Sequence, residues 1–326
     1  MTSSFEFIDD VEKLSKIGPS FIVHSNGKRF EQIARGSLEF FEKLAQKAKS
    51  EGYAPIVLHE FDLTSFATID STHPQIAYGP RNFEHSSLLY AEPSYVVGFW
   101  YLDAKGYYWR SSLAELQFDP SKIDAEAATY FFNGVSGFMK KMNYSKRHQA
   151  LRTDDPLPKV PATIFVQRIE NYRTKIHYLT MKEILETTSA SIDGTIYVKL
   201  HPLQTEEERR EIIDFCAKFE NLQIQEASIH DLIAASEIVI SQNSAVGFEA
   251  MMHQTPAILC AQSDYHHAAL SAKSPTALVD ALQNAHEFDN SFPYKKYFYW
   301  FLHNHMLEVQ KPDFEDRAWS RLMATL

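Results

Sequence analysis

The stretch "SEIVISQNSAVGFEAMMHQTPAIL", residues 236–259, runs from a buried strand through a polar loop and a helix into the next strand. The apolar run "EIVIS" (237–241) and the run "PAILCA" (256–261) are typical of buried strands, and 245–254 has helical character. A strand, a helix and a second strand in so few residues form the repeating unit of a parallel sheet. The stretch therefore predicts an α/β fold.

The same alternation extends over the rest of the second half of the chain. Thr180 and Glu183 form the sequence signature of a capping box at the start of one helix. We expect strands over 163–167, 195–202, 222–226, 237–241 and 256–261, and helices over 180–191, 205–219, 228–236 and 245–254. This order predicts a doubly wound α/β domain of the Rossmann-like type.

The first half of the chain begins with a similar unit. Segments 20–25 and 54–61 are expected to be strands around a helix over 27–52, which Gly52 ends. Segments 95–103 and 106–113 are aromatic and β-rich and predict a hairpin, and 124–142 predicts a helix. Three prolines in "RTDDPLPKVPA" (152–162) mark a seam. We therefore expect three parts: 1–155, 156–290 and a helical tail over 291–326.

Composition and charge limit the classes of function. The 326 residues suit two domains, and 44% hydrophobic with 23% charged residues is typical of a globular protein in water. A net charge of -10 argues against general nucleic-acid binding. We expect no signal peptide, no membrane span and a cytoplasmic location, where Cys216 and Cys260 stay reduced thiols. The basic cluster at 138–152 is either a solvated helix face or a contact with an anionic lipid surface or an anionic acceptor.

Ligands of open parallel sheets bind at the carboxyl ends of the strands. One of these ends carries Gln167, and another reads "VKLHP", in which Lys199 and His201 share a side and Pro202 fixes the turn. A histidine there can donate to a phosphate, although a His-Pro turn alone is common.

The loop "SQNS" at 241–244 stands at a third strand end. Ser241, Asn243 and Ser244 precede the amino end of a helix, where free N–H groups attract anions, although these residue types also serve as plain helix caps. Gly247 leaves room for a ligand or for the sheet. Glu249 either faces a ligand or interacts with the helix dipole. No glycine-rich dinucleotide or P-loop motif occurs. The pattern favours a metal-free phosphate site of a nucleotide-sugar transferase.

"VKLHP", then "VISQNSAVGFEAMMHQTPAI" and "DYHHAALS", together resemble the capsule polysaccharide biosynthesis family of bacterial glycosyltransferases, which includes transferases of 3-deoxy-octulosonic acid (Kdo) from CMP-Kdo. The resemblance covers roughly 160–285 and includes the strand "TIFVQRIEN". It implies a GT-B fold: two Rossmann-like domains facing a cleft, with the tail crossing back to the first. It also implies that His201 and the 241–244 loop bind the phosphate and ribose of CMP, and that Glu249 binds the nucleotide.

The first half departs from this family, because its acidic motif is reduced to "VVGF" (96–99) without the acids. A base or nucleophile is still needed for transfer. The candidates at strand ends are Glu60 and Asp62, then His24 and Asp103, each of which alone is more typical of a turn or surface residue.

Together with these residues, the resemblance implies a glycosyltransferase that moves Kdo or a related acidic sugar from a CMP-activated donor to a bacterial surface polysaccharide or glycolipid. In this interpretation 1–155 faces the acceptor and 156–290 binds the donor, with no metal and no cofactor. The enzyme would work in the cytoplasm or at the inner face of the cytoplasmic membrane, with peripheral membrane association. The alternatives are a non-catalytic nucleotide- or glycan-binding protein on the same scaffold, and a UDP-sugar epimerase-like enzyme.

Overall fold

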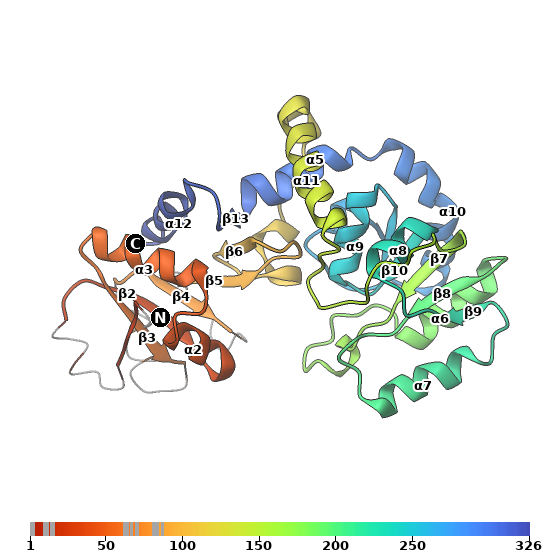
Figure 1. Cartoon of the computed structure of the whole chain (residues 1–326), viewed down its shortest axis with the longest axis horizontal. Coiled ribbons are helices and arrows are strands. Elements are labelled where there is room, and N and C mark those ends of the chain that lie inside the picture. Colours follow the sequence, from red (N-terminus) through yellow and green to blue (C-terminus); the bar gives the residue numbers. More distant parts are fainter. Residues whose placement is uncertain are drawn as a thin grey trace. The chain divides into compact units, whose positions relative to one another are not determined.

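A computed structural model describes residues 4–8, 13, 17–60, 65, 68, 72–79, 85 and 88–326. The chain divides into two compact units, each with its own sheet (Figure 1). The first unit comprises Met1–Ser94, Gly98–Ser112 and Leu302–Leu326, and the second comprises Tyr95–Val97 and Leu113–Phe301. In the described part of the chain, no helix has both the length and the apolar character needed to cross a membrane.

The first unit is built on a mixed sheet in the order β1-β3-β2-β4-β5-β6-β13. The first five strands are parallel neighbours, and β6 and β13 join antiparallel. Their bounds are β1 (Glu6–Phe7), β3 (Ala54–His59), β2 (Ser20–Ser25), β4 (Gln75–Tyr78), β5 (Leu88–Pro93), β6 (Phe99–Asp103) and β13 (Leu307–Glu308). The core is aromatic, with Phe40 stacked on Trp100 at 4.4 Å between ring centroids.

Two elements of the first unit differ from the sequence prediction. The helix expected over 27–52 is two helices, α2 (Gly27–Ala34) and α3 (Glu39–Ser50), because Gly36 takes a positive φ of 63° and turns the chain. The expected hairpin of 95–103 with 106–113 is wrong, since β6 pairs with β5 and residues 108–110 and 112–114 form 3-10 turns. The helix α12 (Phe314–Met323) completes this unit and contacts α3.

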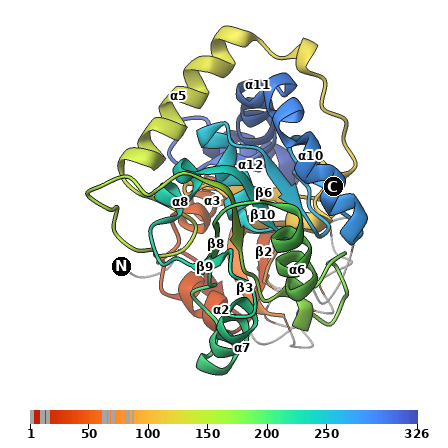
Figure 2. The same cartoon turned by 90° about the vertical axis from the view of Figure 1, so that its right-hand side faces the viewer.

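The second unit has a fully parallel sheet in the order β12-β11-β10-β7-β8-β9, which is the doubly wound arrangement predicted from the sequence. Figure 2 gives a second view of its elements. The strands are β7 (Val160–Phe165), β8 (Ile196–Lys199), β9 (Leu222–Ile224), β10 (Ser236–Ser241), β11 (Ala257–Leu259) and β12 (Leu270–Ser271). The helices are α5 (Ala125–Lys141), α6 (Met181–Ser191), α7 (Glu206–Cys216), α8 (Ile229–Ala235), α9 (Ala245–Ala250), α10 (Pro275–Ser291) and α11 (Tyr294–Phe298).

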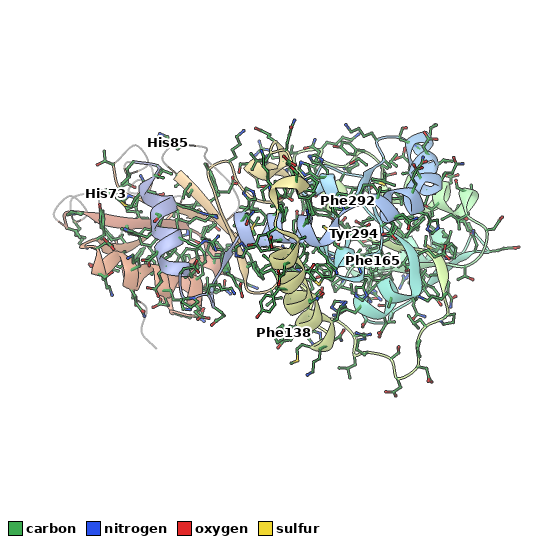
Figure 3. All side chains as sticks on the ribbon, turned by 90° about the horizontal axis from the view of Figure 1, so that it is seen from above. His73, His85, Phe138, Phe165, Phe292 and Tyr294 are labelled. Carbon is green, nitrogen blue, oxygen red and sulfur yellow. The ribbon has the colours of Figure 1, made fainter. Side chains whose placement is uncertain are left out.

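The alternation of side chains along these strands divides the second sheet into two faces. One face, which includes Ile164, Val198 and Ile240, packs in a single apolar core with α6, α7 and α10. Tyr197, Lys199 and Val239 alternate to the other face, and β10 contacts α8 and α9. Phe165, labelled in Figure 3, is the last residue of β7.

The division into units does not follow the seam expected at residue 155. The helix α5 belongs to the second unit, where Phe131 and Phe132 contact the ring of Phe298 on α11. The tail expected to be helical over 291–326 consists of α11, a π-helix (Tyr299–His305), β13 and α12. From Leu302 onward it belongs to the first unit.

Candidate functional site

The strand order of the second sheet reverses between β7 and β10, and Gln167 and Asn243 lie at that point. The backbone N–H of Asn243 donates to Oε1 of Gln167 at 2.7 Å, and Nε2 of Gln167 donates to Oδ1 of Asn243 at 3.2 Å. Nδ2 of Asn243 donates to the carbonyl of Gln262 at 2.8 Å. Crevices at such switch points bind ligands in open α/β sheets. The structure thus joins two of the predicted binding residues at the predicted edge.

The four residues of the "SQNS" loop divide into an inner and an outer pair. Ser241 is 1% exposed and Gln242 is fully buried, where Nε2 of Gln242 donates to the carbonyl of Leu179 at 2.9 Å. Asn243 and Ser244 are half-buried and remain accessible. The hydroxyl of Ser244 accepts from the N–H of Val246 and caps α9. The second half of the loop is therefore accessible, its contact with a ligand stays a prediction, and the first half is buried against the sheet.

Gly247 is required by the packing of the protein itself. A Cβ on this residue would lie 2.6 Å from the hydroxyl of Tyr265 and 3.3 Å from Leu259. The Tyr265 hydroxyl donates to the carbonyl of Ser244, so this buried tyrosine ties the loop after β11 to the start of α9. The sequence predicted that Gly247 leaves room either for a ligand or for the sheet. The structure shows close packing against Leu259 of β11 and against Tyr265.

His201 is held as a neutral donor. Its Nδ1 accepts from the backbone N–H of Leu203 at 3.2 Å, which leaves the ring proton on Nε2. Burial and the positive charges of Arg147 and Arg168 lower the pKa of His201 below its usual 6.5. Within the described residues Nε2 has no hydrogen-bond partner. The ring can therefore donate one hydrogen bond to a ligand at neutral pH.

The residues around His201 support its position. The carbonyl of His201 accepts from the N–H of Gln204 at 3.1 Å, so Pro202 occupies the second position of a tight turn. Lys199 lies 3.7 Å from Glu226, which also binds Arg209 at 2.9 Å, so its positive charge is shared with a carboxylate. Burial lowers the pKa of Lys199, and Glu226 opposes that effect. A contact of Lys199 with a phosphate stays a prediction.

Glu249 is fully buried and directed at a loop about 100 positions earlier in the chain. Its Oε1 accepts from the Ser145 hydroxyl at 2.8 Å and from the N–H of Lys146 at 3.2 Å. Burial raises the pKa of Glu249 to about 7, and these hydrogen bonds lower it only in part. Its described contacts are with the protein, so the nucleotide contact expected for Glu249 stays a prediction.

Two of the catalytic candidates in the first unit have structural partners. His24 is fully buried, with Nδ1 2.7 Å from the Ser65 hydroxyl and Nε2 2.7 Å from Oε1 of Gln75. Burial lowers the pKa of His24 to about 4. Asp103 accepts from the N–H groups of Lys105, Gly106 and Ser112, at 2.7, 2.9 and 3.1 Å. The contacts of His24 stabilise the buried interior of the first unit, and those of Asp103 stabilise a turn. The catalytic role of either residue stays a prediction.

Glu60 lies at the carboxyl end of β3, beside the end of β2, and is 4% exposed. Gly79, with a φ of 151°, makes room for it, since a Cβ there would lie 3.4 Å from Oε2 of Glu60. Nearby, Nη2 of Arg29 binds both carboxylate oxygens of Glu92 at 2.9 Å. Asp62 lies outside the described residues. Glu60 therefore follows the carboxyl end of β3, and its catalytic role stays a prediction.

Sequence reasoning missed Arg147, from a distant segment, as well as Arg168, which directly follows Gln167, and Asp264. The positive charges of Arg147 and Arg168 lower the pKa of His201. Asp264, in the loop after β11, accepts a hydrogen bond from the hydroxyl of Tyr95 at 2.7 Å. Only the basic character of 138–152 signalled the first of these. Among the described residues, no group of three or more His, Cys, Asp or Glu side chains is placed to hold a metal ion. The absence of a metal from the reaction stays a prediction.

No model of a protein family matches the chain, and no curated protein matches it. Among solved structures, the chain resembles the β-Kdo 2,7-transferase of Thermosulfurimonas dismutans KpsC, with a TM-score of 0.53 and 16% identity over 94% of this chain and 99% of that one. The β-Kdo 2,4-transferase of the same KpsC gives 0.51 and 14% over 82% and 90%. The UDP-GlcNAc 2-epimerase of Methanocaldococcus jannaschii gives 0.40 and 10% over 94% and 99%. The first two matches confirm, at the level of fold, the resemblance to capsule-type Kdo transferases and the GT-B-like α/β class.

Proposed function

We propose that the chain is a glycosyltransferase that moves Kdo or a related acidic sugar from a CMP-activated donor to a bacterial surface polysaccharide or glycolipid. The observation that carries this proposal is the set of accessible polar groups at the carboxyl edge of the second sheet. His201, Gln167 and Asn243 follow the adjacent strands β8, β7 and β10. This placement matches the binding edge of doubly wound sheets.

The chemistry of a CMP-sugar suits these groups. When the bond between the sugar and the phosphate breaks, the bonding electron pair stays on a phosphate oxygen, whose charge must be stabilised. The neutral imidazole of His201 offers Nε2–H for this charge. The acceptor hydroxyl attacks the sugar and loses its proton to a base, and Glu60 is our candidate for that base or for a nucleophile. The donor site involves no metal and no further cofactor in this proposal.

The proposal is tested by thermal unfolding with CMP, UDP and GDP. A ligand that binds the folded protein raises its Tm, by about 2.7 kcal/mol of added stability at 100 times its Kd. We expect CMP to raise the Tm and His201→Ala to abolish the increase. An increase with UDP or GDP but none with CMP would remove the CMP-sugar donor, and an increase with UDP would favour the epimerase-like alternative.

A second candidate function is a non-catalytic nucleotide- or glycan-binding protein. The observation that favours it is that His24 and Asp103, two of the catalytic candidates, are hydrogen-bonded to other groups of the protein. Measuring transfer and hydrolysis of a CMP-activated acidic sugar by the intact chain, and by Glu60→Gln and Asp62→Asn, separates the two functions. Turnover that falls by orders of magnitude in either variant supports the transferase, whereas nucleotide binding without any turnover supports the second candidate.

The exposed face of α5 supports a membrane-linked acceptor. Tyr130 and Phe138 of α5 are 84% and 55% exposed, and Met142, directly after the helix, is 46% exposed. Phe138 is labelled in Figure 3. Residues 138–152 include five basic residues, three Lys and two Arg, and no Asp or Glu. Apolar side chains beside positive charge favour an anionic lipid surface, so peripheral membrane association through α5 is part of the proposal.

A further inference from the structure

The loop over residues 143–153, which we call the basic loop, connects α5 to the segment before β7. It turns sharply at Asn143, which has a positive φ of 52°, and it closes on itself. Nδ2 of Asn143 donates to the carbonyl of Ala150 at 3.0 Å, and Nε2 of Gln149 donates to the carbonyl of Asn143 at 2.8 Å. The basic loop therefore has a defined conformation of its own.

Three buried polar side chains of α8 and α9 hold this loop. Glu249 accepts from the Ser145 hydroxyl and from the N–H of Lys146. Nε2 of His230 lies 2.8 Å from the carbonyl of Tyr144. Asp231 accepts from the N–H of Thr153 at 2.8 Å and from Nε of Arg152.

Burying charged groups is costly unless they are paired, so such anchors are expected where the conformation of a loop matters. Glu249, His230 and Asp231 are 0%, 0% and 8% exposed. The second unit therefore places three buried polar groups under one partly exposed loop.

The anchoring fixes where the positive charges of the basic loop lie. Lys146 lies with Nζ 5.4 Å from the ring centre of Tyr95. Arg147 follows directly, is exposed, and makes no ion pair or hydrogen bond within the described residues. Tyr95, beneath Lys146, donates from its hydroxyl to Asp264 in the loop after β11, so the basic loop reaches the strand-end edge where the donor phosphate is proposed. At that edge the positive charge of Arg147 also lowers the pKa of His201. Arg168, the other arginine beside His201, is already bound to Glu208 at 3.0 Å.

We infer that Arg147 is a further ligand for the anionic part of the sugar donor, and that Glu249 positions it by holding the basic loop beside His201. This inference rests on the proposed function of the same site. The shared chemistry is an anionic oxygen, which belongs either to the phosphate or to the carboxylate of the acidic sugar. An arginine suits both, because its planar guanidinium binds two oxygens at once.

Calorimetric titration of the full chain with cytidine, CMP and an intact CMP-activated acidic sugar tests the inference. A charge-assisted hydrogen bond contributes about 1.5–3 kcal/mol, so Arg147→Gln should weaken binding roughly ten- to 100-fold. A loss with CMP but not with cytidine identifies the phosphate as the partner, and a loss only with the intact donor identifies the carboxylate. Equal affinities of Arg147→Gln and the unmodified chain for all three ligands would overturn the inference, as would an equal loss with cytidine.

Two control variants separate this inference from the proposed function. Arg210→Gln makes the same charge change on the exposed side of α7 and should leave all affinities unchanged. His201→Ala should abolish binding of CMP. If His201→Ala has its effect and Arg147→Gln has none, only the inference fails. If neither variant changes binding, or the chain binds none of the three ligands, both fail.

The positioning role of Glu249 has its own readout. Glu249→Gln keeps an oxygen that accepts from Ser145 and Lys146, whereas Glu249→Ala removes both contacts. We expect Glu249→Ala to speed hydrogen exchange at the amides of the basic loop and to lower donor affinity, and Glu249→Gln to restore both. In the Glu249→Ala background, Arg147→Gln should then add little. Fully additive losses in this double-mutant cycle would show that Glu249 does not act through Arg147.

Discussion

At the scale of single residues, Gly247 shows most directly why a residue type is required. A Cβ added there meets the Tyr265 hydroxyl at 2.6 Å, and Tyr265 cannot move away easily because it is fully buried. Overpacking of this kind costs about 1–3 kcal/mol. We therefore expect Gly247→Ala to lower the free energy of unfolding by that amount, measured by urea denaturation.

Gly134 provides the matched control for this measurement. It lies in the exposed part of α5, and a Cβ there meets nothing within 4 Å. Gly134→Ala should leave the stability unchanged or raise it by up to about 1 kcal/mol, because alanine favours a helix. If both variants lose the same stability, the contact with Tyr265 is not the cause.

Glu249 should make stability depend on pH. Its pKa is raised by burial from 4.5 to about 7, so the folded chain holds a proton that the unfolded chain has released between these values. The free energy of unfolding should then fall as pH rises from about 4.5 to 7, by up to roughly 3 kcal/mol, and stay level above. Glu249→Gln has no proton to lose and should remove this fall. Denaturation curves from pH 4.5 to 8 measure it, and identical pH profiles of the two proteins would contradict it.

The residues of the candidate site were predictable where the chain is regular. Gln167, His201 and Asn243 follow strands, and the carboxyl ends of parallel strands meet at one edge, so their placement at the same edge could be read from the sequence. The burial of Ser241 and Gln242 could not be read from the sequence, because it depends on how the surrounding elements pack. The partners of Glu249 were equally hidden, because Ser145 lies 104 positions away and no periodic pattern links the two.

At the scale of elements, local patterns succeeded where one residue controls the backbone. The capping box of Thr180 and Glu183 forms as predicted, with the N–H of Thr180 donating to Glu183 at 2.8 Å. The pattern failed for the hairpin, because aromatic residues such as Tyr107 and Tyr108 satisfy β propensity without forming a strand. In the structure their hydroxyls donate to the carbonyls of Gly79 and Pro93, at 2.7 and 2.9 Å. Tertiary contacts therefore override propensity in this segment.

At the scale of the whole molecule, the sequence predicted two α/β parts, and the structure has two units with one sheet each. Their boundary was not readable from the prolines at 152–162. These prolines follow a helix whose apolar side, including Phe131 and Phe132, packs within the second unit. A proline-rich segment marks where regular structure stops, and it does not show on which side a helix finds its partners.

The charge of the whole chain bears on the proposed membrane association, because a net charge of -10 repels an anionic surface. Any attraction must therefore be local, and the exposed face of α5 with Lys140 and Lys141 at its end is the region that can supply it, because Arg152 is paired with Asp231 and Arg147 is assigned to the donor. We expect the chain to co-sediment with vesicles containing anionic lipid and not with neutral vesicles, and salt to weaken this binding. Phe138→Ser should reduce the bound fraction several-fold, because it removes an apolar group from the proposed contact surface. Ile213→Ser, which changes an exposed apolar residue on α7, should leave binding unchanged. Binding that is equal for neutral and anionic vesicles, or that both variants lower alike, would mean that α5 is not the contact surface.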